Sequence, residues 1–156
     1  MPYPMSWSPL TPDDVLACLL GPQVDALRQR QLNPGQVDPL PALIADVTAR
    51  VRAEIRGNRR NRVELDACLL PPELKLAAAH LALESLQARL PNLALSADQV
   101  RLATDARALL IRVARGEVPI TVPAQPASDL EANSPFGLDV LGHRRQRVTG
   151  ENLSGF

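Results

Sequence analysis

The chain has 156 residues and a mass of 16.9 kDa, which is the size of one domain. Hydrophobic residues make up 46% of it and charged residues 22%, so it holds enough apolar mass for a core. Basic and acidic residues number 17 each, and the resulting net charge of zero argues against a uniformly basic nucleic-acid binder and a disordered acidic chain.

The sequence also favours a protein that is not embedded in a membrane. No apolar run reaches the roughly 18 residues of a membrane span, and residues 1–14 lack the basic start and apolar stretch of a signal peptide. Cys18 and Cys68 lie among apolar neighbours, which predicts buried free thiols in a reducing compartment. We therefore expect a soluble, intracellular protein. Its core is predicted to be aliphatic, because the only aromatic residues lie near the chain ends: Tyr3, Trp7, Phe136 and Phe156.

Two short helices are predicted first. Thr11 followed by Pro12, Asp13 and Asp14 is typical of a helix start, with a hydroxyl cap, a proline in the first turn and carboxylates near the positive end of the dipole. This helix is predicted to run through Leu20 and to end at Gly21. Pro22 opens the second, which the residues 33–35 (Asn-Pro-Gly) close.

Three longer helices follow. Asp38-Pro39 begins one whose apolar residues recur every three or four positions up to Ile55 and which ends at Gly57. Residues 59–70 form a loop in which Val63, Leu65 and Leu69 are candidates for short extended pairing. Residues 72–90 form an Ala- and Leu-rich helix, expected to be the most enclosed one. A capping box of Ser96 and Gln99 then starts a last helix that stops at Gly116.

The character of the chain changes after Gly116. Prolines interrupt residues 117–156, and apolar periodicity disappears. Fully extended, this stretch reaches roughly 130 Å, far beyond the radius of the domain. It contains two apolar islands, 136–141 and 153–156, and between them the basic patch His143-Arg144-Arg145-Gln146-Arg147. Such islands are typical of a docking peptide and have no use in a solvated linker.

Catalytic signatures are missing from the sequence. It has no Gly-rich phosphate loop, no Cys-x-x-Cys, no nucleophile elbow and no zinc-protease motif. His80 and Glu84 share a helix face, but two ligands without a third make no metal site, so a helix-surface or partly buried polar pair is the better interpretation. We expect no enzyme activity, no metal and no cofactor.

A cluster of arginines lies between residues 50 and 62. Its members are Arg50, Arg52, Arg56, Arg59, Arg60 and Arg62, offset only by Glu54. The cluster suits a phosphate backbone or an acidic protein partner. Equally, it suits a solvated helix end, where cations stabilise the negative pole of the dipole.

The order of these segments resembles the head–tail connector, or neck, proteins of Mu-like tailed phages. The resemblance runs from about Leu10 to the end and is carried by Leu10 to Leu16, Asp38 to Gly57, Leu70 to Lys75 with Ala88 to Pro91, and Ala108 to Glu117. The ending Arg144 to Leu153 is also similar to that of many members. Gly150 and Val148 depart from the pattern, in which an arginine and an aromatic residue are frequent, and this weakens an anchoring role for that peptide.

The resemblance implies a structural virion protein of the phage neck, made in the cytoplasm of the bacterial host. Such adaptors form a homo-oligomeric ring, commonly a dodecamer, beneath the portal protein. The ring extends the channel through which genomic DNA passes without sequence-specific binding, and it offers a surface to the stopper or tail-terminator protein. No membrane partner is implied. In this plan the C-terminal arm reaches onto the portal.

We therefore predict an all-α protein: a small helical bundle of three main helices and two short N-terminal ones, with a long extended C-terminal arm. The predicted parts are an N-terminal extension (1–10), a helical domain (11–116) and a docking arm (117–156). The predicted portal-docking residues are Phe136, Leu138, Val140, Leu141, Arg144, Arg145, Arg147, Leu153 and Phe156. Arg56, Arg59, Arg60 and Arg62 are the candidates for a channel or subunit contact. The alternatives are a tail-side neck protein (stopper or tail completion) and a small DNA-binding regulatory protein.

Overall fold

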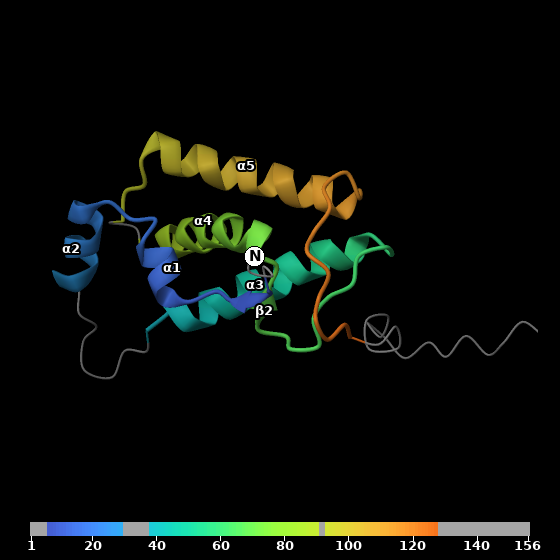
Figure 1. Cartoon of the computed structure of the whole chain (residues 1–156). Coiled ribbons are helices and arrows are strands. Elements are labelled where there is room, and N and C mark those ends of the chain that lie inside the picture. The colour runs from blue at the N-terminus through green and yellow to red at the C-terminus, as the bar shows by residue number, and fades with distance from the viewer. Residues whose placement is uncertain (1–5, 30–37, 91–92, 128–156) are drawn as a thin grey trace, which may run out of the picture.

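The computed structural model of the chain describes residues 6–29, 38–90 and 93–127. Within these ranges the chain forms five helices and one two-stranded sheet (Figure 1). The predicted fold class, a small all-α bundle with three main helices and two short N-terminal ones, is confirmed.

Three helices of 18 residues each form the body of the molecule: α3 (Leu40–Gly57), α4 (Pro72–Arg89) and α5 (Ala97–Ala114). The ends of α3 and α5 meet, since a Cβ atom added to Gly57 would lie 3.4 Å from the Cβ of Ala114. These two helices therefore run in the same direction, and α4 runs back between them (Figure 1).

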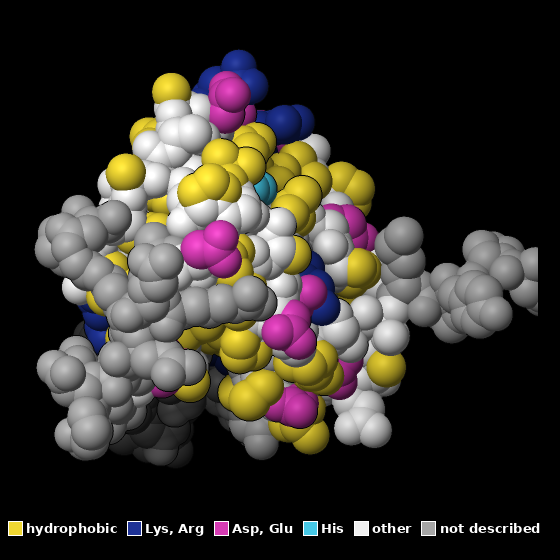
Figure 2. All heavy atoms as spheres, turned by 90° about the vertical axis from the view of Figure 1, so that its left-hand side faces the viewer, with side chains coloured by type: hydrophobic (Ala, Val, Ile, Leu, Met, Phe, Trp, Pro, Cys, Tyr) yellow, Lys and Arg dark blue, Asp and Glu magenta, His cyan; other side chains and the backbone are white. Residues whose placement is uncertain are grey.

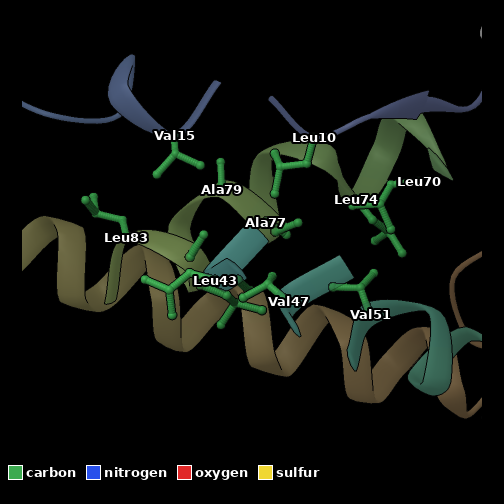
Figure 3. Packing of buried hydrophobic residues seen from close by; sticks show 14 of the residues in the cluster. Leu10, Val15, Leu43, Val47, Val51, Leu70, Leu74, Ala77, Ala79 and Leu83 are labelled. Carbon is green, nitrogen blue, oxygen red and sulfur yellow. The ribbon is translucent and has the colours of Figure 1, made fainter. Parts of the chain in front are cut away.

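Helix α4 is the most enclosed of the three. It contacts α1, α3 and α5, and its alanines and leucines are buried around most of its circumference. Leu74 and Leu83 of α4 belong to the same cluster of buried residues as Leu43 and Val51 of α3 (Figure 3). Small alanine side chains let neighbouring helices approach closely, which explains why an Ala-rich sequence occupies this position.

The predicted helix starts are largely confirmed. Thr11 and Ser96 cap α1 (Pro12–Leu16) and α5, and Asp14 and Gln99 close the two capping boxes from the third helical position. However, α1 ends at Leu16 rather than Leu20. Gly21, predicted as a stop, begins α2 (Gly21–Gln29). The predicted stop at 33–35 lies outside the described residues.

The prediction of a purely aliphatic core is wrong, because Trp7 belongs to the core. Trp7 also lies in residues 1–10, which were predicted to be an extension outside the helical domain. Its side chain is 6% exposed, and its indole Nε1 donates a hydrogen bond of 2.8 Å to the carbonyl of Thr121. Strand β1 (Ser8–Pro9) then pairs antiparallel with β2 (Leu69–Leu70). Leu10 is buried in the same core. An aromatic residue near a chain end is in the core here because the strand pairing folds that end back onto the helices.

The segment after α5 is also part of the folded unit, although the arm was predicted to begin at residue 117. Val118 and Ile120 pack against the core. Further along, Leu65 N–H donates to Gln125 at 2.7 Å and Ala127 N–H donates to Val63 at 2.9 Å. We call residues 117–127 the strap. The short extended pairing predicted for Val63, Leu65 and Leu69 is thus present.

Glu64 holds the strap in place through hydrogen bonds to its backbone. Its carboxylate accepts hydrogen bonds from the backbone N–H groups of Ala124 (2.9 Å) and Gln125 (2.8 Å). Glu64 is only 5% exposed, so these bonds satisfy a charge that would otherwise be costly to bury.

The two cysteines differ in exposure. Cys18 is half-buried, and this burial raises the pKa of its thiol. The negative charge of the nearby Asp14 carboxylate raises the same pKa further, by a smaller amount. Cys68, by contrast, is exposed, so the prediction that both thiols are buried is wrong for it. It lies in the turn before β2, where Asp66 accepts a hydrogen bond from its backbone N–H.

Candidate functional site

The predicted docking residues of the arm lie outside the described residues. They are Phe136, Leu138, Val140, Leu141, Arg144, Arg145, Arg147, Leu153 and Phe156. Among the candidates, the structure therefore describes only the arginines of the α3 end and the loop that follows.

Arg56, Arg59, Arg60 and Arg62 are all exposed or partly exposed and lie within one short stretch of chain. Arg56 belongs to the last turn of α3, and the others follow in the turn and loop after it. This arrangement agrees with the sequence expectation of a cationic surface at the end of a helix. Guanidinium groups bind carboxylates and phosphates in a bidentate manner, so the chemistry of this surface suits an anionic partner.

Arg52 does not belong to that surface, although the sequence cluster included it. It is 4% exposed and donates hydrogen bonds to the carbonyls of Asp66 (2.9 Å), Leu69 (2.9 Å) and Glu64 (2.5 Å). Burial lowers the pKa of the Arg52 guanidinium, and the charge of Arg56 acts in the same direction. Arg52 therefore organises the loop between α3 and α4.

Two asparagines hold the turn after α3 in place. The side chain of Asn58 accepts a hydrogen bond from Arg60 N–H at 3.0 Å. The side chain of Asn61 donates at 3.4 Å to the carbonyls of Ile55 in α3 and Val113 in α5. The same carbonyls also accept hydrogen bonds from the backbone N–H groups of Asn58 (3.3 Å) and Gly116 (2.9 Å), so Asn61 adds a bond to each and ties the two helix ends together.

Arg112 and Arg115 join the same end of the bundle. Both are exposed and flank the end of α5, with Glu117 at 3.6 Å from the Nε of Arg112 and 3.9 Å from a terminal nitrogen of Arg115. We name the six residues the basic end: Arg56, Arg59, Arg60, Arg62, Arg112 and Arg115. Sequence reasoning missed the last two because it did not establish that α3 and α5 run parallel.

The electrostatics of the basic end have two consequences. Two helix C-termini meet there, and the cations stabilise the negative poles of both dipoles. The exposed ion pairs with Glu117 contribute little to stability, because water and salt screen them. Two of the six arginines of the basic end, Arg112 and Arg115, pair with Glu117, and the positive charge of the six suits an anionic surface.

His80 and Glu84, which share a helix face in the sequence pattern, have different neighbours in the structure. Glu84 forms an ion pair with Arg107 of α5. His80 instead faces a groove between α4 and α5, and burial lowers the pKa of its imidazole. Across the described ranges, no three His, Cys, Asp or Glu side chains are grouped so that they would hold a metal ion.

No protein-family model, no curated protein and no solved structure matches this chain. Among the helices of residues 6–29, 38–90 and 93–127, none has both the length and the apolar character needed to cross a bilayer.

Proposed function

We propose that the chain is an adaptor of a phage neck, a structural virion protein that forms a ring on the portal and joins the head to the stopper or tail. The proposal starts from the sequence resemblance to connectors of Mu-like phages. The all-α bundle with a strap leading into a C-terminal arm is compatible with that plan.

One relationship carries the proposal: the strap ends beside the basic end, at the point where residues 128–156 begin. Ala127, the last described residue, bonds through its N–H to the carbonyl of Val63 at 2.9 Å, and Val63 directly follows Arg62. Residues 128–156, with their apolar islands and three arginines, thus continue from the end of the bundle that carries the six arginines. Two binding elements at one end suit a protein that attaches to a large partner with that end.

In a ring, each weak contact of this kind is repeated by every subunit. Repetition raises the overall affinity without requiring a large apolar interface on each copy. The arginines of the basic end are then suited to acidic surfaces of the portal or a neighbouring subunit, or to the phosphates of DNA in the channel.

The test is native mass spectrometry of the full chain, alone and mixed with the portal protein encoded in the same genome. The expected result is a portal-bound ring with near-equal stoichiometry. The triple variant Arg56→Glu, Arg59→Glu, Arg60→Glu is expected to weaken this complex at least tenfold. A matched control is Arg50→Glu, Arg89→Glu, Arg101→Glu, which changes the net charge equally at exposed positions outside the basic end.

Two results would overturn the proposal. A wild-type chain that ignores the portal would favour a tail-side neck protein, either a stopper or a tail-completion protein. Specific DNA binding that falls by orders of magnitude between 50 and 200 mM salt would favour the DNA-binding regulatory protein, whose phosphate contacts the same arginines would supply.

A further inference from the structure

A groove of about 330 Å³ lies between α4 and α5, away from the basic end's loop. Leu76 and His80 line it from α4, and Leu102 and Leu109 line it from α5. Two carboxylates, Glu73 and Asp105, also belong to the lining, which includes no lysine or arginine. The histidine of the described residues is visible in Figure 2 among hydrophobic side chains of the surface.

Two leucines of this groove are open to water. Leu76 is 64% exposed and Leu102 is 40% exposed, although both lie on helices whose inner faces form the core. Covering such side chains is favourable, since burial of apolar area drives association.

His80, which lines the groove, has a buried nitrogen without a hydrogen-bond partner. Its Nδ1 is the one buried side-chain nitrogen or oxygen in the described ranges that has no hydrogen-bond partner. Buried polar atoms without partners are rare in folded proteins.

We propose that residues 136–147 of the same chain bind in this groove. In an extended peptide Phe136, Leu138 and Val140 project from one face, because side chains alternate, and so present three apolar groups together. Arg144, Arg145 and Arg147 follow, with charges opposite to the carboxylates of the groove. Apolar contacts and charge are thus complementary between the segment and the groove.

The chain is long enough for this contact. The strap already touches the groove's border, because Glu73 accepts a hydrogen bond of 3.1 Å from Thr121 N–H. Ala127 is six residue steps beyond Thr121, which places it within about 20 Å of that border at full extension. The nine residues from 128 to 136 span up to about 30 Å, so Phe136 reaches back to the groove.

An intramolecular contact is favoured over one between copies in the free chain. A segment tethered through eight residues has an effective concentration on the order of millimolar, well above the micromolar concentrations at which a purified chain is handled. This inference does not depend on the proposed neck function, because it concerns the chain before it meets any partner.

Photocrosslinking tests the contact in the full chain. Phe136 is replaced by p-benzoylphenylalanine, the sample is irradiated at micromolar concentration, and the linked peptides are identified by mass spectrometry. Mixing chains labelled with ¹⁴N and ¹⁵N distinguishes links within a chain from links between chains. We expect links within one chain to α4 or α5 peptides that contain Leu76, Leu102 or Leu109.

A charge placed in the groove provides the specificity control. Leu76→Asp, made in the same photoreactive chain, is expected to reduce the groove links at least tenfold. Leu20→Asp alters a leucine of similar exposure (56%) outside the groove lining and is expected to leave them unchanged. Circular dichroism checks that both variants retain the helical content of the parent.

Three outcomes would overturn the proposal. The first is the absence of groove links in a folded chain. The second is links that Leu76→Asp and Leu20→Asp affect equally. The third is groove links found only between ¹⁴N and ¹⁵N chains, which would assign the groove to an interface between copies. None of these outcomes bears on portal binding, so the two proposals fail separately.

Discussion

The guanidinium carbon of Arg52 lies 5.9 Å from the centre of the Trp7 ring, so a buried cation rests over a buried indole. This contact joins the N-terminal segment to α3. The indole nitrogen of Trp7 in turn bonds to Thr121 of the strap, while Arg52 bonds to three carbonyls of the loop before α4. Four segments distant in sequence therefore meet around two side chains.

Replacing Arg52 by methionine is expected to lower the free energy of unfolding by about 3 kcal/mol, since hydrogen bonds from a charged donor are lost and buried carbonyls remain unpaired. Urea denaturation followed by circular dichroism measures this change. Arg56→Met, an exposed arginine one turn further along α3, is the matched control and is expected to change stability by less than about 0.5 kcal/mol. Equal losses in the two variants would contradict the structural role assigned to Arg52.

Truncation separates the strap from the rest of the C-terminal region. A chain that ends at Ala127 keeps the described strap contacts, so it is expected to stay folded and to lose only the stabilisation that the proposed groove contact of residues 136–147 supplies. A chain that ends at Val122 lacks the N–H groups of Ala124 and Gln125 and leaves the Glu64 carboxylate buried without them. We expect it to lose about 2–4 kcal/mol. If both truncations proved equally stable, the strap would not belong to the folded unit.

Gly116 is required by the conformation of the turn after α5. Its φ is +77°, and a Cβ at this position would lie 2.1 Å from the side-chain nitrogen of Asn58. Gly116→Ala is expected to cost at least about 1 kcal/mol, because alanine disfavours this left-handed conformation and displaces Asn58. Gly21→Ala is the control: its new Cβ meets no atom within 4 Å, and thermal unfolding is expected to show no loss. A loss of the same size at both glycines would refute this explanation.

The sequence predicted the helices well because their signals are local. Capping residues such as Thr11 and Ser96 act on the next turn, and the apolar repeat from Leu40 to Ile55 marks the buried side of one helix. Local signals do not reveal which segments meet in space. The burial of Trp7 and Arg52 therefore escaped prediction, since it depends on β1–β2 pairing and on carbonyls of a distant loop.

The sequence likewise predicted only part of the basic end. Arg56, Arg59, Arg60 and Arg62 are close in sequence, so their clustering is evident from the amino-acid order alone. The contribution of Arg112 and Arg115 follows only from the parallel arrangement of α3 and α5. Nor does the sequence distinguish Leu76, which is exposed, from the buried Leu74 and Leu81 of the same Leu-rich helix.

His80 makes the stability of the fold depend on pH. Burial lowers the pKa of its imidazole below the ordinary value of 6.5, so the folded state binds a proton less readily than the unfolded chain does. Its contribution to stability is therefore present above pH 6.5 and is lost as the pH falls through the lowered pKa of the folded state.

Replacing His80 by leucine removes this titration and fills an apolar site with an apolar side chain. The free energy of unfolding of the wild type is expected to fall relative to that of His80→Leu as the pH is lowered from 7.5 to 5. Urea denaturation at several pH values measures the difference, and Glu84→Gln serves as a control for a neighbouring group on α4 that is paired with Arg107. A difference between wild type and His80→Leu that stays constant with pH would show that the imidazole keeps its ordinary pKa on folding, because linkage requires a shifted pKa to appear as a slope.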